Sequence, residues 1–117
     1  MEEKNMEDCS FCKIIDGTIP AKKLYEDDIC VAFNDTKPLA PTHFLVVPKR
    51  HIGSAVELTD DDAMMVGHIF AVISLLTQIF GISDGYRVVT NCGKSAGQTV
   101  HHLHFHVLAG KELGTFN

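Results

Sequence analysis

The clearest pattern in the chain is a long segment whose apolar residues repeat with the spacing of an amphipathic helix. Thr59 and Asp62 have the spacing of a capping box at its start, and Gly81 is expected to end it. The apolar residues between these signals lie three or four positions apart, which places them on one helix face: Met65, Ile69, Val72, Leu76 and Ile79. This face requires another layer to pack against.

The rest of the chain consists of short apolar segments separated by turn residues. Ser10 is expected to cap a short helix that continues to Ile15 and ends before Gly17. Five segments with strand-like composition are expected over residues 23–26, 29–35, 43–47, 86–91 and 102–108. We therefore expect an α+β fold with one long and one short helix and a five-stranded, mostly antiparallel sheet ordered as a meander. The exposed edges of so small a sheet favour a dimer.

Length and charge narrow the class of protein. The 117 residues suit a single domain, expected over 9–117, with a flexible tail over 1–8. A net charge of −5 without a basic stripe argues against a nucleic-acid partner. The charged N-terminus lacks a signal pattern, and no apolar run approaches the ~18 residues of a membrane helix. We expect no membrane contact and a cytoplasmic location, with the nucleus as a second one.

Three histidines alternate near the C-terminus: His102, His104 and His106. Residues two apart in a strand share a face, so the imidazoles should line a solvent-facing groove while the apolar residues between them pack toward the helix. The alternatives are three incidental polar residues and a metal site on this strand. The preceding loop favours catalysis, because Gly97 removes a Cβ, and the Thr99 hydroxyl and backbone N–H groups suit a phosphate.

The segment from Gly97 to Leu108 resembles the signature of the histidine triad (HIT) superfamily, in which histidines alternate with apolar residues. Segments similar to the histidine triad nucleotide-binding branch span about residues 8–110: Ile14–Ile15, Ile19–Lys22, Glu26–Asp28, Phe33, Asp35, Ala40–Lys49, His51–Ile52 and Gly85–Arg87. The resemblance implies a homodimer with a continuous ten-stranded sheet. It also implies a hydrolase that cleaves purine nucleoside monophosphate derivatives, such as phosphoramidates and acyl-adenylates, at the α-phosphate and releases AMP or GMP.

The same resemblance implies roles for individual residues. His104 would attack the α-phosphorus and carry a nucleotidyl intermediate, and His106 would contact the phosphate oxygens. Thr99 or a neighbouring histidine would assist the leaving group. Asp35 matches an acid that hydrogen-bonds the ribose. The other expected nucleotide contacts are Phe11 and Phe33 beside the base, and Asn34, Asn91, Gly97, Gln98 and Val100.

Cys9 and Cys12 form a C-x-x-C pair at the start of the predicted short helix. The pair is open to three interpretations: a redox pair, two inert cysteines, or half of a structural zinc site with His51 and His102 as the remaining ligands. Other branches of the superfamily pair an N-terminal C-x-x-C with these two histidines, which implies one structural zinc ion per chain. His101 is the nearest rival ligand, but its side chain should point away from that of His102.

Three alternatives to the phosphoramidase interpretation stay open: a dinucleoside polyphosphate hydrolase, a nucleotidyltransferase, and a non-enzymatic nucleotide- or zinc-binding module. The C-terminus departs from the family, because many nucleotide-binding members end in Trp-Pro-Pro-Gly, and this chain ends in Leu113–Asn117 without a tryptophan. The other two histidines are expected at a strand edge (His43) and on the helix surface (His68).

Overall fold

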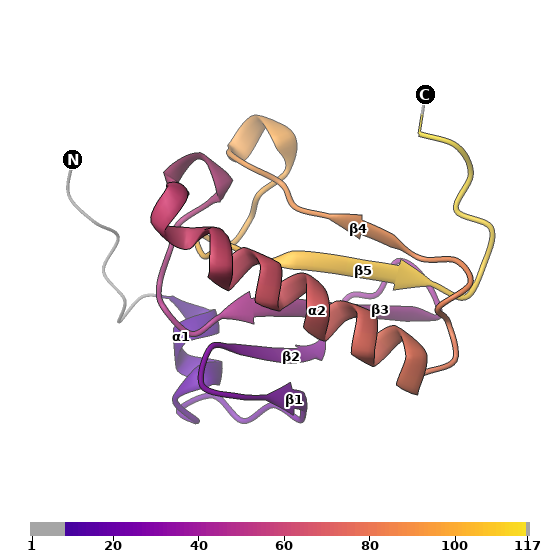
Figure 1. Cartoon of the computed structure of the whole chain (residues 1–117), viewed down its shortest axis with the longest axis horizontal. Coiled ribbons are helices and arrows are strands. Elements are labelled where there is room, and N and C mark those ends of the chain that lie inside the picture. The colour runs from indigo at the N-terminus through magenta and orange to yellow at the C-terminus, as the bar shows by residue number, and fades with distance from the viewer. Residues whose placement is uncertain (1–8, 117) are drawn as a thin grey trace.

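The fold is built on one antiparallel sheet with a helix on each face. The computed structural model describes residues 9–116, and the tail expected over 1–8 lies outside the described residues. The helices are α1 (Ser10–Ile15) and α2 (Ala63–Ile79), and Figure 1 shows α2 lying across the sheet. The strands are β1 (Lys23–Glu26), β2 (Cys30–Asn34), β3 (Thr42–Pro48), β4 (Arg87–Val89) and β5 (Phe105–Ala109). The predicted α+β fold class is confirmed.

The strands are ordered β1-β2-β3-β5-β4, and every neighbouring pair is antiparallel. The expected meander is therefore wrong for the last two strands, because β4 takes the edge and β5 returns between β3 and β4. A central position suits β5, since Phe105 and Val107 are buried and its backbone finds hydrogen-bond partners on both sides. The histidine segment that leads into β5 is thereby brought to the middle of the sheet.

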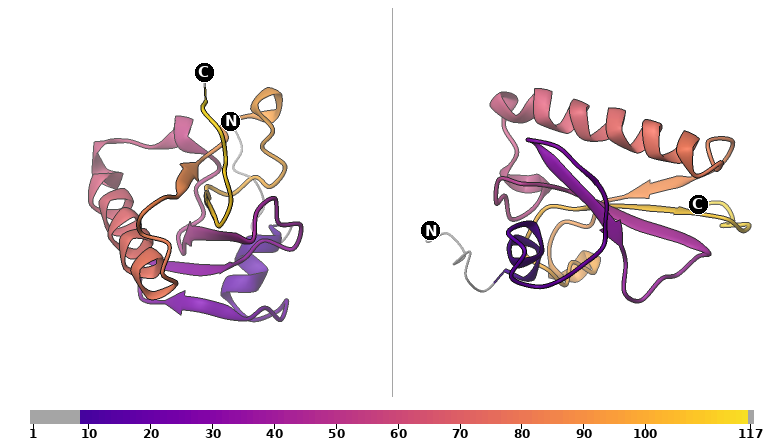
Figure 2. Two further views of the ribbon diagram at one scale, coloured as in Figure 1. Left: turned by 90° about the vertical axis from the view of Figure 1, so that its right-hand side faces the viewer. Right: turned by 90° about the horizontal axis from the view of Figure 1, so that it is seen from below.

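The two faces of the sheet carry separate apolar cores. Figure 2 shows α2 on one face and α1 on the other. The core beneath α2 includes Phe44, Ile69 and Phe105, and the core beneath α1 includes Phe11 and Leu45. Because alternate residues of a strand point to opposite faces, β2 and β3 each contribute to both cores.

Helix α2 follows the predicted capping signal through a 3-10 turn over Asp60–Asp62, and the last residue of its predicted apolar face is exposed. Thr59 and Asp62 form the predicted capping box. The expectation that Ile79 is buried is wrong, because its side chain is 63% exposed. Phe80, which follows the helix and is 41% exposed, contacts the core instead, and its ring lies 5.7 Å from that of Phe44.

The segment Asp60–Ile79 is long and apolar enough to span a membrane by length and composition alone. This differs from the expectation that no segment has those properties. In the folded chain, one face of this helix packs against the sheet, where Ile69 and Leu76 are buried. Its apolar character is thus partly accounted for by the core of the domain.

The last strand begins later than predicted. Pairing starts at Phe105 rather than His102, because the N–H of Leu103 donates to the carbonyl of Ile52 (2.6 Å) and not to a neighbouring strand. The alternation of side chains persists: Leu103 joins the core beneath α2, while His102 and His104 contact α1 on the other face. Both histidines are buried, so the expected solvent-facing groove is wrong for them. The reason is that α1 covers them.

Candidate functional site

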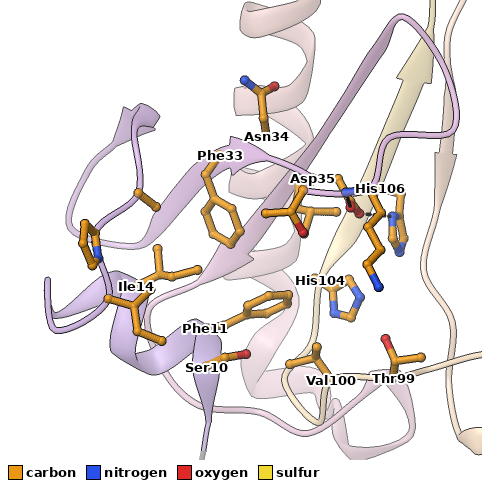
Figure 3. Close-up of a pocket in the computed structure, with 16 residues that line it drawn as sticks. Ser10, Phe11, Ile14, Phe33, Asn34, Asp35, Thr99, Val100, His104 and His106 are labelled. Atoms are coloured by element: carbon orange, nitrogen blue, oxygen red, sulfur yellow. Dashed lines mark hydrogen bonds and ion pairs between the residues drawn. The ribbon is translucent and has the colours of Figure 1, made fainter.

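A cleft of about 410 Å³ lies between α1, the end of β2 and the segment that leads into β5. Figure 3 shows Phe11 and Phe33 at one side of the cleft and His104 and His106 at the other. Asp35 follows the end of β2 and lies beside His106 (Figure 3). The cleft therefore combines an apolar part with a polar part, as small-molecule sites commonly do.

His104 has a tautomer that is determined by the backbone. Its Nδ1 lies 2.6 Å from the carbonyl oxygen of His102, and a carbonyl only accepts hydrogen bonds. Nδ1 therefore carries the proton, and Nε2 keeps its lone pair. Burial lowers the pKa of His104 below its usual 6.5. The side chain is thus a neutral imidazole with an unprotonated nitrogen, which is the form that acts as a nucleophile.

His106 is held in the opposite tautomer by a chain of hydrogen bonds. The N–H of Leu39 donates to Nδ1 of His43 (3.0 Å), so neutral His43 carries its proton on Nε2. That nitrogen lies 2.9 Å from Nδ1 of His106 and donates to it. Neutral His106 then carries its own proton on Nε2, which makes this atom a hydrogen-bond donor. Burial lowers the pKa of His106 as well, so its neutral form is favoured.

His43 is the residue that sequence reasoning missed. It was expected at a strand edge, yet it is 4% exposed and its Nε2 lies 3.5 Å from a carboxylate oxygen of Asp35. The pattern of β3 contained a usable signal. His43, Leu45 and Val47 alternate along the strand, so they share the face that packs against α1 and carries the other histidines.

The other predicted nucleotide contacts divide into two groups. Asn34, Thr99 and Val100 line the cleft, together with the residues already described. The three that lie outside its lining are Asn91, Gly97 and Gln98. The amide of Gln98 instead holds the loop together, because it accepts from the N–H of Gly93 (2.8 Å) and donates to the carbonyls of Gly53 (2.7 Å) and Val100 (3.0 Å).

Cys9, Cys12, His51 and His102 come together next to the cleft, and their ligand atoms all lie within 4.8 Å of one another. The Sγ of Cys12 lies 3.2 Å from Nδ1 of His51 and 3.6 Å from Nδ1 of His102, and the Sγ of Cys9 lies 3.3 Å from the latter. A tetrahedral zinc ion with typical bond lengths separates sulfur and nitrogen ligands by about 3.6 Å. The spacing of these atoms therefore fits such an ion.

The orientation of His102 also fits a metal ligand. Its Nε2 lies 2.9 Å from the carbonyl oxygen of Pro48 and must donate to it, which leaves the lone pair on Nδ1 facing the two sulfur atoms. Burial lowers the pKa of His102 to about 4, so the imidazole is neutral. Burial, and then the hydrogen bond with Cys9, raise the pKa of the Cys12 thiol to about 12. A dication between the sulfurs would offset this penalty.

Helix α1 connects the group of two cysteines and two histidines with the cleft. Cys9, rather than the expected Ser10, caps the helix, because its Sγ accepts from the N–H of Cys12 (3.3 Å). Between the two cysteines lies Phe11, whose ring contacts His102 (centroids 5.9 Å apart) and His104 (5.1 Å). The position of the aromatic wall of the cleft thus depends on the segment that carries the two thiols.

His101 lies outside the Cys9–Cys12 cluster, as expected. Its Nε2 lies 3.9 Å from a carboxylate oxygen of Glu57, and its side chain is 43% exposed.

A second cluster lies away from the cleft, where His68 of α2 donates to Asp27 (2.6 Å) close to the thiol of Cys30. His68 is thus more than a helix-surface residue, because it ties α2 to the turn between β1 and β2.

Comparison with known proteins agrees with this geometry. The family model of the HIT domain matches residues 16–113. An uncharacterised HIT-like protein of Synechococcus elongatus is 45% identical over 107 residues, which cover 92% of this chain and 94% of that protein.

Solved structures give the same result. A histidine triad protein from Clostridium difficile is 47% identical with a TM-score of 0.90, and the match covers 100% of both chains. A HIT family hydrolase from Clostridium thermocellum is 41% identical with a TM-score of 0.92, and the match covers 96% of this chain and 98% of that one. These similarities support hydrolase chemistry in general. The chain therefore belongs to the HIT domain family.

Proposed function

We propose that this protein hydrolyses purine nucleoside monophosphate derivatives, such as phosphoramidates and acyl-adenylates, with His104 as the nucleophile. The observation that carries the proposal is the pair of opposed tautomers in the cleft. His104 offers a lone pair on Nε2, while His106 offers a proton on Nε2. An attack on phosphorus needs both, because one group forms the new bond and the other stabilises the charge on the phosphate oxygens.

The cleft has a suitable partner for each part of a nucleotide. Phe11 and Phe33, whose ring centroids lie 5.4 Å apart in an edge-to-face arrangement, give the apolar wall for the base. Asp35 accepts the ribose hydroxyls. Thr99 and the backbone next to Val100 lie on the side of His104 and contact the phosphate (Figure 3).

The reaction proceeds in two displacements. Nε2 of His104 forms a bond to the α-phosphorus as the bond to the leaving amine or acyl oxygen breaks, and a leaving amine takes up a proton delivered from solvent through Thr99 or a neighbouring histidine. Water then attacks the phosphorus of the nucleotidyl-imidazole, the P–N bond breaks, and AMP or GMP is released. His106 donates from Nε2 to a phosphate oxygen in both steps, and His43 and Asp35 hold it in that orientation. His43 is thus a positioning residue.

Cys9, Cys12, His51 and His102 are proposed to hold one structural zinc ion. Four protein ligands leave no open position on the metal, so its contribution is to fix the chain and not to activate a substrate. His102 has a double task, because its ring faces the thiols and its carbonyl orients His104. We place the chain in the cytoplasm, with the nucleus as a second location and no nucleic-acid or membrane partner.

A homodimer with a continuous ten-stranded sheet is part of the proposal. Strand β4 has only three residues and lies at the sheet edge. Large apolar side chains are exposed near this edge: Tyr86 (38%) directly precedes β4, and Phe70 (45%) of α2 packs against Phe105 of the neighbouring β5 (ring centroids 5.5 Å apart). Pairing of two such edges would cover this apolar surface.

The test compares adenosine 5′-phosphoramidate with diadenosine polyphosphates as substrates of the wild-type protein and of His104→Ala. The proposal expects turnover of the phosphoramidate, with a loss of at least about a thousandfold in His104→Ala, because the nucleophile is removed. Faster turnover of diadenosine polyphosphates would favour the polyphosphate hydrolase instead. Binding of AMP without turnover of any substrate would favour the non-enzymatic module.

A further inference from the structure

Lys37 is the one lysine or arginine among the residues that line the cleft, and Asp35 is the one carboxylate. Both histidines on the polar side have Nδ1 engaged in a hydrogen bond, His104 with the carbonyl oxygen of His102 (2.6 Å) and His106 with Nε2 of His43 (2.9 Å). A nucleotide phosphate brought to this cleft would therefore meet the negative charge of Asp35, and Lys37 is the lining residue that offsets it.

The backbone of Lys37 is fixed at the rim of the cleft. Its N–H donates to a carboxylate oxygen of Asp35 (2.8 Å), which forms an Asx turn at the end of β2, and Pro38 follows directly. The ribose-binding acid and the lysine are thus held two residues apart on the same short loop. A lysine stem spans about 6 Å, so an ammonium anchored here has the polar side of the cleft within its range.

The charge of Lys37 is not used elsewhere in residues 9–116. Lys23 and Lys49, by contrast, both pair with Glu26 (3.3 and 2.9 Å). Lys37 takes part in no ion pair among the described residues, and its side chain is exposed. An unpaired cation beside a cleft whose lining holds one carboxylate and two histidines is a feature that an anionic ligand would satisfy.

We propose that Lys37 binds the α-phosphate of the nucleotide and sets the preference of the cleft for phosphorylated nucleosides over nucleosides. The proposal rests on the nucleotide-binding function given above. Because the residue acts by its charge, Lys37→Arg is expected to keep the contribution to phosphate binding and Lys37→Gln is expected to lose it. The contribution is modest and falls with salt, because the side chain is exposed to solvent.

The test measures the dissociation constants of AMP and adenosine for the wild-type protein, Lys37→Gln, Lys37→Arg and the matched control Lys22→Gln. Lys22 is exposed, has the same charge and lies outside the lining of the cleft. At low salt, Lys37→Gln is expected to weaken AMP binding by about three- to tenfold and to leave adenosine binding unchanged. Lys37→Arg and Lys22→Gln keep the affinity of the wild type, and high salt reduces the difference.

Two outcomes would overturn the proposal. Equal AMP affinity in the wild type and Lys37→Gln would show that the charge does not contact the phosphate. An effect limited to substrates whose leaving group carries a carboxylate, with AMP binding unchanged, would assign Lys37 to the leaving group instead. If the wild-type protein binds neither AMP nor adenosine, the proposed function itself fails, and this result is distinct from a failure that is specific to Lys37.

Discussion

At the scale of single residues, the site depends on which nitrogen of each histidine carries the proton. The carbonyl of His102 leaves Nε2 of His104 unprotonated, and the N–H of Leu39, acting through His43, leaves Nε2 of His106 protonated. Both tautomers trace back to backbone groups, a carbonyl that only accepts and an N–H that only donates. Chemically identical side chains are thereby given different tasks.

The pH profile follows from the environment of His104. Burial lowers the pKa of this imidazole, so it stays unprotonated as the pH falls through the usual histidine value of 6.5. We expect kcat/KM for the phosphoramidate to be level through pH 6.5 and to decline only in more acidic solution. An acid limb with its midpoint at or above pH 6.5 would contradict this, provided that the metal content is constant over the range.

At the scale of elements, a carboxylate ties the long helix to the sheet. In the turn between β1 and β2, one oxygen of Asp27 accepts from the N–H groups of Ile29 (2.8 Å) and Cys30 (2.9 Å). The other oxygen accepts from the hydroxyl of Tyr25 (2.9 Å) and from Nε2 of His68 in α2 (2.6 Å). Four hydrogen bonds to one side chain make this turn a fixed point of the fold.

Replacement of Asp27 by asparagine should therefore destabilise the protein. The amide has one acceptor oxygen for four donors, so we expect the free energy of unfolding to fall by about 1–3 kcal/mol. Urea denaturation at neutral pH measures it, with Asp28→Asn on the exposed neighbour as the control. A loss of unfolding free energy no larger than that of Asp28→Asn would show that the hydrogen bonds of Asp27 contribute little to stability.

The stabilisation by the Asp27 carboxylate is expected to decrease at low pH. Burial alone would raise the pKa of Asp27, but the hydrogen bonds from His68 and the backbone outweigh it and hold the pKa well below the usual 3.8. A carboxyl with a lowered pKa stabilises the folded state above the pKa of the unfolded state. The difference in stability between the wild type and Asp27→Asn should thus shrink as the pH falls below about 4.

At the scale of the whole molecule, the N-terminal segment and the segment before β5 are joined at one point. Cys9 and Cys12 face His51 and His102, although about ninety residues separate the cysteines from His102. The helix between these contacts supplies Phe11 to the cleft. Loss of the proposed metal would therefore act on both stability and nucleotide binding.

Removal of the metal by a chelator under reducing conditions should lower Tm by roughly 10 °C and weaken AMP binding, because α1 loses its anchor. Metal content, thermal unfolding and AMP titration measure these effects. Cys92→Ser is the control, because Cys92 lies outside the cluster. Purified protein without bound metal, with reduced thiols and unchanged Tm on chelation, would contradict the zinc site.

The sequence by itself predicted the fold class, the C-x-x-C pair with its two histidines as one cluster, and half of the residues that line the cleft. These features follow local patterns, such as the spacing of α2 and the alternation before β5, or the family resemblance. The dimer and the bound metal stay predictions. The tertiary structure decided three further features: the placement of β5 inside the sheet, the burial of His104 beneath α1, and the link from His43 to His106. They depend on contacts between segments that are distant in the chain, and no local pattern records which backbone group will face a given imidazole.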